Sequence, residues 1–446
     1  MSATILADGQ SEVDTVTLSL PAYQKEITTW ESYSLNKRFL TPTDAWTFVV
    51  DTADASLATI LVPGAEVQLS VNGAPQCTGY IDKRRIEASE SGTRITISGR
   101  DILGPVVDAT VDPAFAFAAS TTLVTFLAAL LAPFGITTIY NSDLYNYQVL
   151  TGWPAGVHKA SGGSTVTAQN LGGASIVGST VSVDTQPTRP DLHTLQLTQA
   201  KPHAGEGVYA YIDRMLRRLG LTLWAMADGS GVVVDVPNYA GDATQQQIRH
   251  KTDASSASNT VEPGSSVDFD LSEQPSVIVA TGFGSGQDTQ KSKLRVIMIN
   301  ELTGLDDSGD PLPDILAIKA RYPSAVVLPL RSQLKALTRP QGDPKINRPF
   351  FLKDDESKNL QQLEAFVRRE MGRRQQKALT CNYVVKGHTS DGTHPWSVNT
   401  MTTVDDDVFG VSEPMWIVER TFSKTFGSGT RTAMKLIRPN TLMISA

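Results

Sequence analysis

Four short stretches of the sequence carry side chains that could hold a ligand. Residues 282–286 read GFGSG and follow an apolar run, as a phosphate-binding glycine loop follows a strand. The spacing is GxGxG rather than GxGxxG, and the QDTQKSK after it has no apolar helical stripe. We therefore interpret this stretch as a turn.

Two acidic clusters could bind a cation. Asp306, Asp307 and Asp310 suggest a calcium loop, but a twelve-residue loop begun at Asp306 needs a carboxylate where Ala317 stands. We expect a solvated loop there. The run Asp405–Asp407 favours a hairpin turn exposed to water over a cation site.

The remaining reactive residues form no recognised site. His388 and His394 lie near Trp396 at a spacing that matches no dedicated zinc pattern, so we interpret them as loop histidines. Cys77 lies in mid-strand without a nucleophile motif, and Cys381 is a whole domain away. A pair of glycosidase carboxylates stays open, since any two acids can meet in space. We identify no catalytic residue, cofactor-binding residue or metal ligand, and expect neither an enzyme nor a cofactor.

Length and charge narrow the class of protein. A chain of 446 residues predicts three or four domains, at roughly 100 to 200 residues each. A net charge of −7 disfavours a nucleic acid held by charge, although DNA could pass by without being gripped. No basic segment precedes an apolar stretch at the start, and the longest apolar run, 123–134, is too short to cross a bilayer. We expect assembly in a cytoplasm, without membrane insertion.

Strand patterns dominate the first hundred residues. Residues 66–71 alternate apolar side chains, and Asn72-Gly73 supplies the positive φ angles of a type I′ hairpin turn. A second strand over about 76–87 and a third around Ile95 and Ile97 complete a meander. Asp101 can then cap a short helical turn, which Pro105 keeps short. This pattern indicates the last strands of a small antiparallel barrel.

The middle of the chain is mixed. Residues 121–134 predict a short buried helix, and residues 208–219 predict a helix ended by Gly220. Between them, 143–191 are rich in Gly, Ser, Thr and Val. An inserted β-rich excursion and an unstructured surface segment are both consistent with that composition.

The last third alternates strand and helix patterns. Residues 275–299 predict strands, and a long helix follows from about Asp354 to Gln376. Its arginines predict a solvent face, with an acidic neighbouring subunit as the alternative: Arg368, Arg369, Arg373 and Arg374. The chain ends in further strands, so a β-rich region stands at each end.

The segment 79–108 resembles a signature of the baseplate hub proteins of Mu-like contractile-tailed bacteriophages. The matching residues are Gly79, Tyr80, Ile81, Asp82, Ser98, Gly99, Arg100, Asp101, Leu103, Val107 and Asp108. Later blocks are similar in the same order: the helix opened by Gly205, which also resembles half of a LysM peptidoglycan-binding module, the pair Arg339-Pro340, the helix 355–376, Gly387 with Trp396, and the closing GSGTRTAMKLIRP. The excursion 143–191 is not part of the family pattern.

The resemblance implies an α+β, β-rich fold with two tail-tube-like antiparallel β-barrel domains and two smaller α/β domains, one of them LysM-like. The first barrel would span 1–104. The LysM-like α/β domain would span 105–260, with its insertion. The second barrel would combine 261–300 with 377–446, around a small helical and loop domain at 301–376.

The resemblance also implies a function. Three chains with two barrels each would form a trimeric ring of six tube-like units, between a hexameric tail tube protein and a trimeric central spike protein. Tape measure and baseplate wedge proteins would be further partners, and DNA would pass through the lumen without specific binding. The protein would be part of the virion tail, assembled in the host cytoplasm. Two alternatives stay open: a peptidoglycan-binding or cell-wall-degrading tail component, and the hub of a phage-like bacteriocin.

Overall fold

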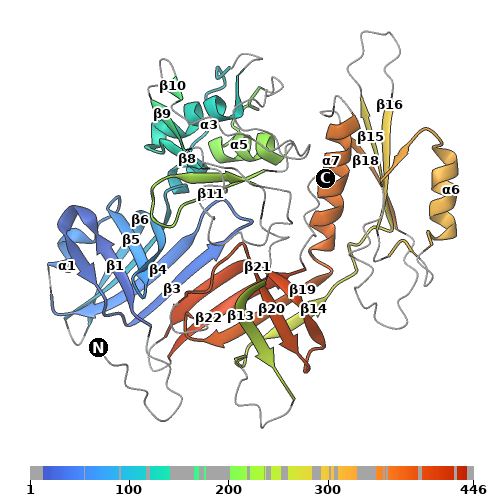
Figure 1. Ribbon diagram of the computed structural model, residues 1–446. Coiled ribbons are helices and arrows are strands. Elements are labelled where there is room, and N and C mark those ends of the chain that lie inside the picture. Colours follow the sequence, from blue (N-terminus) through green and yellow to red (C-terminus); the bar gives the residue numbers. More distant parts are fainter. Residues whose placement is uncertain are drawn as a thin grey trace. The chain divides into compact units, whose positions relative to one another are not determined.

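The computed structural model of the chain is shown in Figure 1. It divides into two compact units: the first comprises Met1–Arg217, Leu221–Ser266 and Cys381–Leu436, and the second comprises Arg218–Gly220, Val267–Thr380 and Ile437–Ala446. The structure describes residues 14–54, 56–89, 92–116, 121–140, 165–169, 175–176, 201–217, 221–235, 237, 243–252, 260–283, 293–300, 303–305, 310–328, 348–354, 357, 360–389, 394–425 and 429–438. The β-rich class predicted from the sequence is confirmed, because large antiparallel sheets dominate.

An antiparallel set of strands opens the first unit. Its members run in the order β2-β1-β5-β6-β7-β4-β3 across the sheet. Short helical turns η1 (Pro21–Tyr23), α1 (Leu57–Ile60) and α2 (Gly104–Asp108) connect or follow them. The strands are β1 (Val16–Leu20), β2 (Lys25–Ile27), β3 (Ser32–Arg38), β4 (Ala45–Thr52), β5 (Glu66–Val71), β6 (Ala74–Ser89) and β7 (Gly92–Asp101).

The predicted meander is confirmed in its turn and its alternation. Asn72 and Gly73 have φ angles of 50° and 81°, the left-handed values that a type I′ turn requires. Val67, Leu69 and Val71 of β5 are fully buried while the residues between them are not. Because side chains alternate across a strand, one face of the sheet forms the core.

The last strands of the chain extend the same sheet. β21 (Val411–Lys424) pairs antiparallel with β3, so that Glu419 lies opposite Arg38 and Lys424 opposite Tyr33. The order continues through β22 (Thr430–Ile437) to β19 (Leu379–Lys386). β20 (Thr400–Asp406) pairs with β21, and β13 (Ala243–His250) pairs parallel with β20. β14 spans Ser266–Phe269. The predicted β-rich regions at the two ends of the chain are thus joined edge to edge.

A small α/β layer completes the first unit. Its sheet has the order β10-β9-β8-β12-β11, with strands Ser175–Ile176, Thr165–Gln169, Thr138–Tyr140, Val232–Asp235 and Thr222–Ala225. The predicted buried helix is α3 (Leu123–Leu131), whose first turn is capped by the Thr122 hydroxyl accepting from the Thr125 N–H. The turn η2 (Ala132–Phe134) follows, and α5 (Val208–Arg217) is the second predicted helix. Gly220 lies outside the described residues.

Within the excursion 143–191, the described strands favour the β-rich alternative. β9 pairs antiparallel with β8 through Val166 opposite Ile139, and β10 pairs with β9. These seven residues are therefore part of the α/β layer rather than separate from it.

The second unit is a four-stranded sheet covered by one helix on each face (Figure 1). The strand order is β17-β16-β15-β18, with bounds Val326–Val327, Lys293–Ile299, Val277–Phe283 and Pro349–Asp354. Helix α7 (Leu360–Gln375) buries Leu363, Val367 and Met371 against one face of β15 and β16. Helix α6 (Pro313–Arg321) buries Ile315 and Ile318 against the other.

This sheet corrects two predicted boundaries. From the sequence, 261–300 are expected in the second barrel and 301–376 in a separate helical and loop domain. β15 and β16 pair instead with β17 and β18, which the second of those ranges supplies. The reason is burial: Val277 to Ala280 and Gly282 are all buried, as a strand covered on both faces requires. No helix in the described parts of the chain is long and apolar enough to cross a bilayer.

Candidate functional site

The family-motif residues of 79–108 gather where the middle of β6 pairs antiparallel with the end of β7. Gly79 and Gly99 allow the two backbones to approach, since a Cβ on Gly79 would lie 1.9 Å from the Arg100 carbonyl oxygen. A Cβ on Gly99 would lie 2.0 Å from the Tyr80 carbonyl oxygen and 2.4 Å from the ring of Trp46. Real Cβ atoms do not come this close to other atoms, so these two positions require glycine.

Arg100 ties the end of the meander to the helix that follows. Its Nε and Nη2 atoms donate to the carboxylate of Asp82 at 2.7 and 3.3 Å, and its Nη1 and Nη2 atoms donate to that of Asp108 at 2.8 and 2.6 Å. The hydrogen bonds from Arg100 hold the pKa of Asp108 below its usual value. Three motif residues that are separate in the sequence thus form one paired cluster, which fixes the chain where it leaves the sheet.

Asp101 is buried beside a second carboxylate. Its Oδ1 accepts from the N–H of Leu103, the residue before α2, and its Oδ2 accepts from the N–H of Asp44, both at 3.0 Å. Burial, with the nearby charge of Asp44, raises the pKa of Asp101 to about 8. The prediction that Asp101 caps the short helix is wrong in detail: the N-cap residue of α2 is Leu103, no side chain caps the helix, and Asp101 accepts instead from the N–H of Leu103 in front of it.

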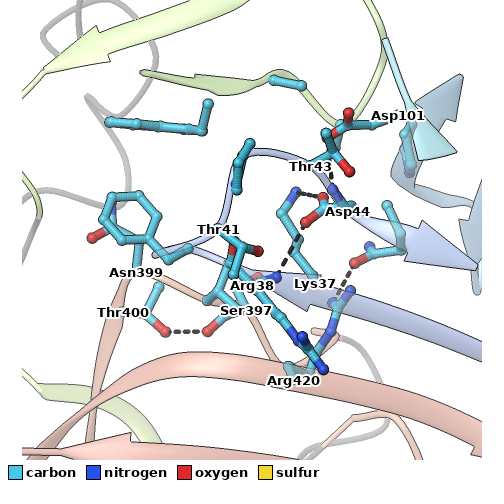
Figure 2. Close-up of a pocket in the computed structure, with 18 residues that line it drawn as sticks. Lys37, Arg38, Thr41, Thr43, Asp44, Asp101, Ser397, Asn399, Thr400 and Arg420 are labelled. Carbon is cyan, nitrogen blue, oxygen red and sulfur yellow. Dashed lines mark hydrogen bonds and ion pairs between the residues drawn. The ribbon is translucent and has the colours of Figure 1, made fainter. Parts of the chain in front are cut away.

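A cavity of about 180 Å³ opens next to Asp101 within the first unit (Figure 2). The segment between β3 and β4, the start of β6, the β11–β12 hairpin and the loop 397–400 all line it. Lys37 Nζ lies 3.5 Å from Asp44 Oδ2, and the Arg38 N–H donates to Asp44 Oδ1 at 3.2 Å. The Arg38 side chain pairs with Glu419 at 2.8 Å. Charged groups of both signs therefore border the cavity.

Arg420 of β21 also lines the cavity and is almost completely buried. Its Nη1 donates to Gln76 Oε1 at 2.7 Å and to the carbonyl oxygen of Trp396 at 2.8 Å. Its guanidinium carbon lies 3.7 Å from the ring centre of Phe422. Burial lowers the pKa of Arg420 to about 10, so the side chain is still charged at neutral pH.

Arg420 was not predicted from the sequence, and neither were Lys37 and Asp44 near it. One signal was present: Trp416, Val418, Arg420 and Phe422 alternate along β21, which places an arginine at an inward-facing position. Lys37 and Asp44 had no such signal, because they approach Asp101 through the turn between β3 and β4. The motif residue Trp396 is buried and contacts this region through its backbone.

His388 lies in the loop after β19, as predicted, and is buried there. Its Nε2 lies 2.7 Å from the Tyr33 hydroxyl, and its Nδ1 lies 3.3 Å from the Thr432 hydroxyl. Burial lowers the pKa of His388 to about 4 despite the opposing charge of Asp14. His394 is exposed, as expected. His388 therefore links β3 with β22 as a neutral residue.

The acidic run at 405–407 lies only partly in the predicted turn: Asp405 and Asp406 end β20, Asp407 begins the turn, and the middle residue is not exposed. Asp406 is fully buried and accepts a hydrogen bond from the Tyr383 hydroxyl at 2.7 Å. Its Oδ1 also accepts from the N–H groups of Val408 and Phe409. Burial and the bond to Asp406 raise the pKa of Tyr383. The carboxylate of Asp406 therefore stabilises the turn that follows β20.

The arginines of α7 are not all on a solvent face. Arg368 is buried, with 8% of its surface exposed, and the Arg374 guanidinium lies 4.2 Å from the ring centre of Phe350. Arg373 is exposed and pairs with Glu370. The predicted solvent face is therefore wrong for Arg368, which is buried.

Other predicted residues are placed as follows. Gly205 has a φ of 75° and precedes Glu206, which pairs with Arg214 of α5 through Nε at 2.8 Å. Cys77 and Cys381 are buried and unbridged, and burial raises the pKa of Cys77. Among the described residues, no group of three or more His, Cys, Asp or Glu side chains could hold a metal ion. Predicted residues outside the described ranges are Arg339, Pro340, Gly284, Gly286, Asp306 and Asp307.

Comparison with known proteins gives consistent similarities. Residues 17–101 match the family model described as Mu phage baseplate assembly protein GpP-like, N-terminal. A stretch of 121 residues is 28% identical to the baseplate hub protein gp44 of Escherichia phage Mu, covering 27% of this chain and 32% of the Mu protein. The predicted resemblance to the baseplate hub proteins of Mu-like phages is therefore confirmed.

Two solved structures share the fold over nearly the whole chain. The tail protein from Neisseria meningitidis MC58 aligns with a TM-score of 0.63 at 16% identity, covering 97% of this chain and 98% of its own. The 43 kDa tail protein of prophage MuSo2 from Shewanella oneidensis aligns with a TM-score of 0.60 at 16% identity, covering 96% of this chain and 100% of its own. Together these similarities support a structural role in a phage baseplate.

Proposed function

We propose that this chain is the structural hub of a contractile phage tail baseplate and has no catalytic activity of its own. The match of residues 17–101 to a baseplate assembly family carries the proposal. This range contains the paired strands β6 and β7, and it includes Asp82 and Arg100 of the Asp82–Arg100–Asp108 cluster. The fold shared with two tail proteins extends the similarity to the rest of the chain.

In this proposal, three chains form a ring. The strands before residue 102 and those after residue 378 are two strand sets in one sheet, joined through β3 and β21. If each set corresponds to one tail-tube-like barrel, three chains present six such units and match a six-fold tube on one side and a three-fold spike on the other. The tail tube protein, the central spike protein, the tape measure protein and the baseplate wedge proteins are the partners.

DNA passage follows from the same arrangement. The net charge of −7 favours a lumen along which DNA moves without being held, because binding to phosphates requires clustered Lys and Arg. The protein would reside in the virion tail after assembly in the host cytoplasm.

The mass and symmetry of the purified protein test the proposal. Sedimentation velocity and cryo-electron microscopy, alone and with the cognate spike protein, should give a particle of three 48.1 kDa chains with three-fold symmetry. A peptidoglycan pull-down and a cell-wall turbidity assay on the same preparation should show neither retention nor lysis. A monomer in both conditions, or specific retention on glycan, would contradict the hub and favour a cell-wall component.

A further inference from the structure

Asp14 joins the two strand sets at a point outside the β3–β21 pairing. Its Oδ1 accepts from the side-chain amide of Asn72 at 2.9 Å, in the turn between β5 and β6. Its Oδ2 accepts from the His388 N–H at 2.6 Å and from the Thr430 hydroxyl at 3.1 Å, and both donors belong to the other strand set. We call this group the Asp14 clasp. One carboxylate therefore holds a hairpin turn of the first set against two positions of the second.

Asn72 is the member of the clasp that can change chemically. It is followed by Gly73 in the only Asn-Gly pair of the sequence, and both residues are exposed. Glycine has no Cβ, so its backbone nitrogen is the least hindered nucleophile that can follow an asparagine. A Cβ at Gly73 would meet no atom within 4 Å, so the space around this turn is open.

Two hydrogen bonds hold the Asn72 side-chain amide away from the Gly73 nitrogen. Its Oδ1 accepts from the Thr15 N–H at 2.9 Å, while its Nδ2 donates to Asp14. The Asn72 N–H also donates to the Thr15 carbonyl oxygen at 2.8 Å. For a ring to close, Cγ of Asn72 must turn onto the Gly73 nitrogen and Nδ2 must leave, so residues 14–15 have to move away first. We call residues 14–15 the strap.

We propose that Asn72 is a deamidation site that the strap protects, and that its conversion opens the Asp14 clasp. The Gly73 nitrogen attacks Cγ of Asn72, the N–Cγ bond forms as the Cγ–Nδ2 bond breaks, and Nδ2 leaves as ammonia with the proton from Gly73. Water then adds to one of the two ring carbonyls. Breaking the N–Cγ bond gives aspartate, and breaking the bond from this nitrogen to the backbone carbonyl carbon gives isoaspartate. Nothing in the hub proposal requires this site.

Either product removes a donor from Asp14. An amide nitrogen donates, whereas an ionised carboxylate only accepts, so residue 72 then faces Asp14 with a second negative charge. Like charges at hydrogen-bond distance repel, which drives the strap away from the turn. The His388 N–H and the Thr430 hydroxyl lose their acceptor when the strap leaves, and a donor without a partner is destabilising. Deamidation at one exposed turn therefore weakens the contact between the two strand sets.

Peptide mass spectrometry of the full chain, incubated at mildly alkaline pH, measures the conversion of Asn72. The parent should convert slowly, and Asp14→Ala, which removes the acceptor of Nδ2, should convert at least fivefold faster. Asp112→Ala, at an exposed carboxylate elsewhere in the first unit, is the matched control and should keep the parent rate. Asn399 is an internal reference that should stay intact, because its φ of 61° is also positive but the bulkier Thr400 follows it.

Thr430→Val keeps the test open if Asp14→Ala does not fold. It removes one donor to Asp14 and leaves every contact of Asn72 in place, so it should raise the rate in the same direction by a smaller factor. Asn72→Asp reproduces the product with an unaltered main chain. Its hydrogen exchange should rise in peptides that contain the strap and residues 387–388, more than in Asn72→Ser, which adds no charge.

Three results would overturn the site: equal rates in the parent, Asp14→Ala and Thr430→Val; an intact Asn72 in all three; or equal exchange in Asn72→Asp and Asn72→Ser. These measurements need neither a ring nor a spike protein. A trimeric hub with an inert Asn72, and a deamidating chain that forms no hub, are both readable outcomes, so the two proposals fail separately.

Discussion

The two units of the molecule hold their sheets together by different means. Where β6 pairs with β7, Gly79 and Gly99 let the backbones of the two strands approach closely, and Arg100 pairs with two carboxylates. In the second unit, apolar side chains of α6 and α7 cover both faces of a short sheet. The first arrangement depends on single residues at fixed positions, whereas the second depends on apolar volume that several residue types can supply.

The distribution of tryptophan allows the two units to be followed separately. All six tryptophans, at positions 30, 46, 153, 224, 396 and 416, fall in the ranges of the first unit. Intrinsic tryptophan fluorescence therefore reports on unfolding of the first unit. Hydrogen exchange of peptides from β15, β16 and α7 reports on the second.

Replacing Gly99 should have the largest effect. In Gly99→Ala the new methyl group would collide with the Tyr80 carbonyl and the Trp46 ring, so we expect the first unit to lose about 4 kcal/mol of unfolding free energy. Urea denaturation followed by tryptophan fluorescence measures this. The control is Gly429→Ala, where a Cβ would meet no atom within 4 Å. Equal urea midpoints for the two variants would show that β6 and β7 can move apart at Gly99 without a loss of unfolding free energy.

Truncating the α7 stripe should come next and should act on the other unit. Leu363 is fully buried against β15 and β16, so Leu363→Ala should leave a cavity and destabilise the second unit by about 3 kcal/mol. Hydrogen exchange should rise in β15 and β16, while the fluorescence midpoint of the first unit stays unchanged. Leu316→Ala, at a residue 49% exposed on α6, should change neither readout. A matching shift in tryptophan fluorescence would mean that the units unfold together.

Acid should weaken the first unit through His388. The pKa of His388 is about 4 in the folded chain against 6.5 for the free side chain, so between these values the unfolded chain binds a proton that the folded chain does not. This component of stability is intact above pH 6.5 and is lost as the pH falls to 4, by up to about 3 kcal/mol.

Urea midpoints at several pH values between 7 and 4, read by tryptophan fluorescence, measure the His388 component. His388→Gln should flatten the dependence, whereas His394→Gln, at an exposed position, should keep the parent slope. If both variants follow the parent curve, the acid sensitivity arises from other groups.

Removing the Arg100 cluster should have the smallest effect. The side chains of Asp82 and Asp108 are 41% and 60% exposed, and paired charges in water contribute little, so Arg100→Met should cost about 1 kcal/mol in the first unit. The difference from the parent should shrink in about 0.5 M NaCl, because salt screens exposed charges. Arg85→Met, which removes a more exposed pair with Glu87, is the control and should be neutral. A difference insensitive to salt would assign the role of Arg100 to packing.

Local patterns predicted most of the elements but not how strands are shared between sheets. The Asn72-Gly73 turn, α3, α5 and α7 each follow from residues within one element. The sheet to which 275–299 belong could not be predicted in this way. A continuous apolar run marks a strand covered on both faces, but it does not identify which helices cover it. The covering residues of α7 lie far along the sequence, from 65 positions (Met298 to Leu363) to 93 positions (Ile278 to Met371) later.

The site shows the same limit. The motif at 79–108 singled out Asp82, Arg100 and Asp108 without predicting that they pair, and the structure brings them together. The burial of His388, Asp406 and Arg420 was not predicted, since each depends on partners in distant strands. Tyr33 and Gln76 contact residues more than 340 positions away. The one sequence signal for this burial was the alternation along β21, which places Arg420 at an inward-facing position.

The pairing of β3 with β21 has a consequence for synthesis. Residues 33–38 meet residues 419–424, so a ribosome must release the chain as far as residue 424 before the β3 edge acquires its neighbour. During translation that edge stays open to other chains, and closing so distant a contact is slow. We expect nascent molecules to depend on chaperones over this interval, and chains stopped before codon 424 to aggregate.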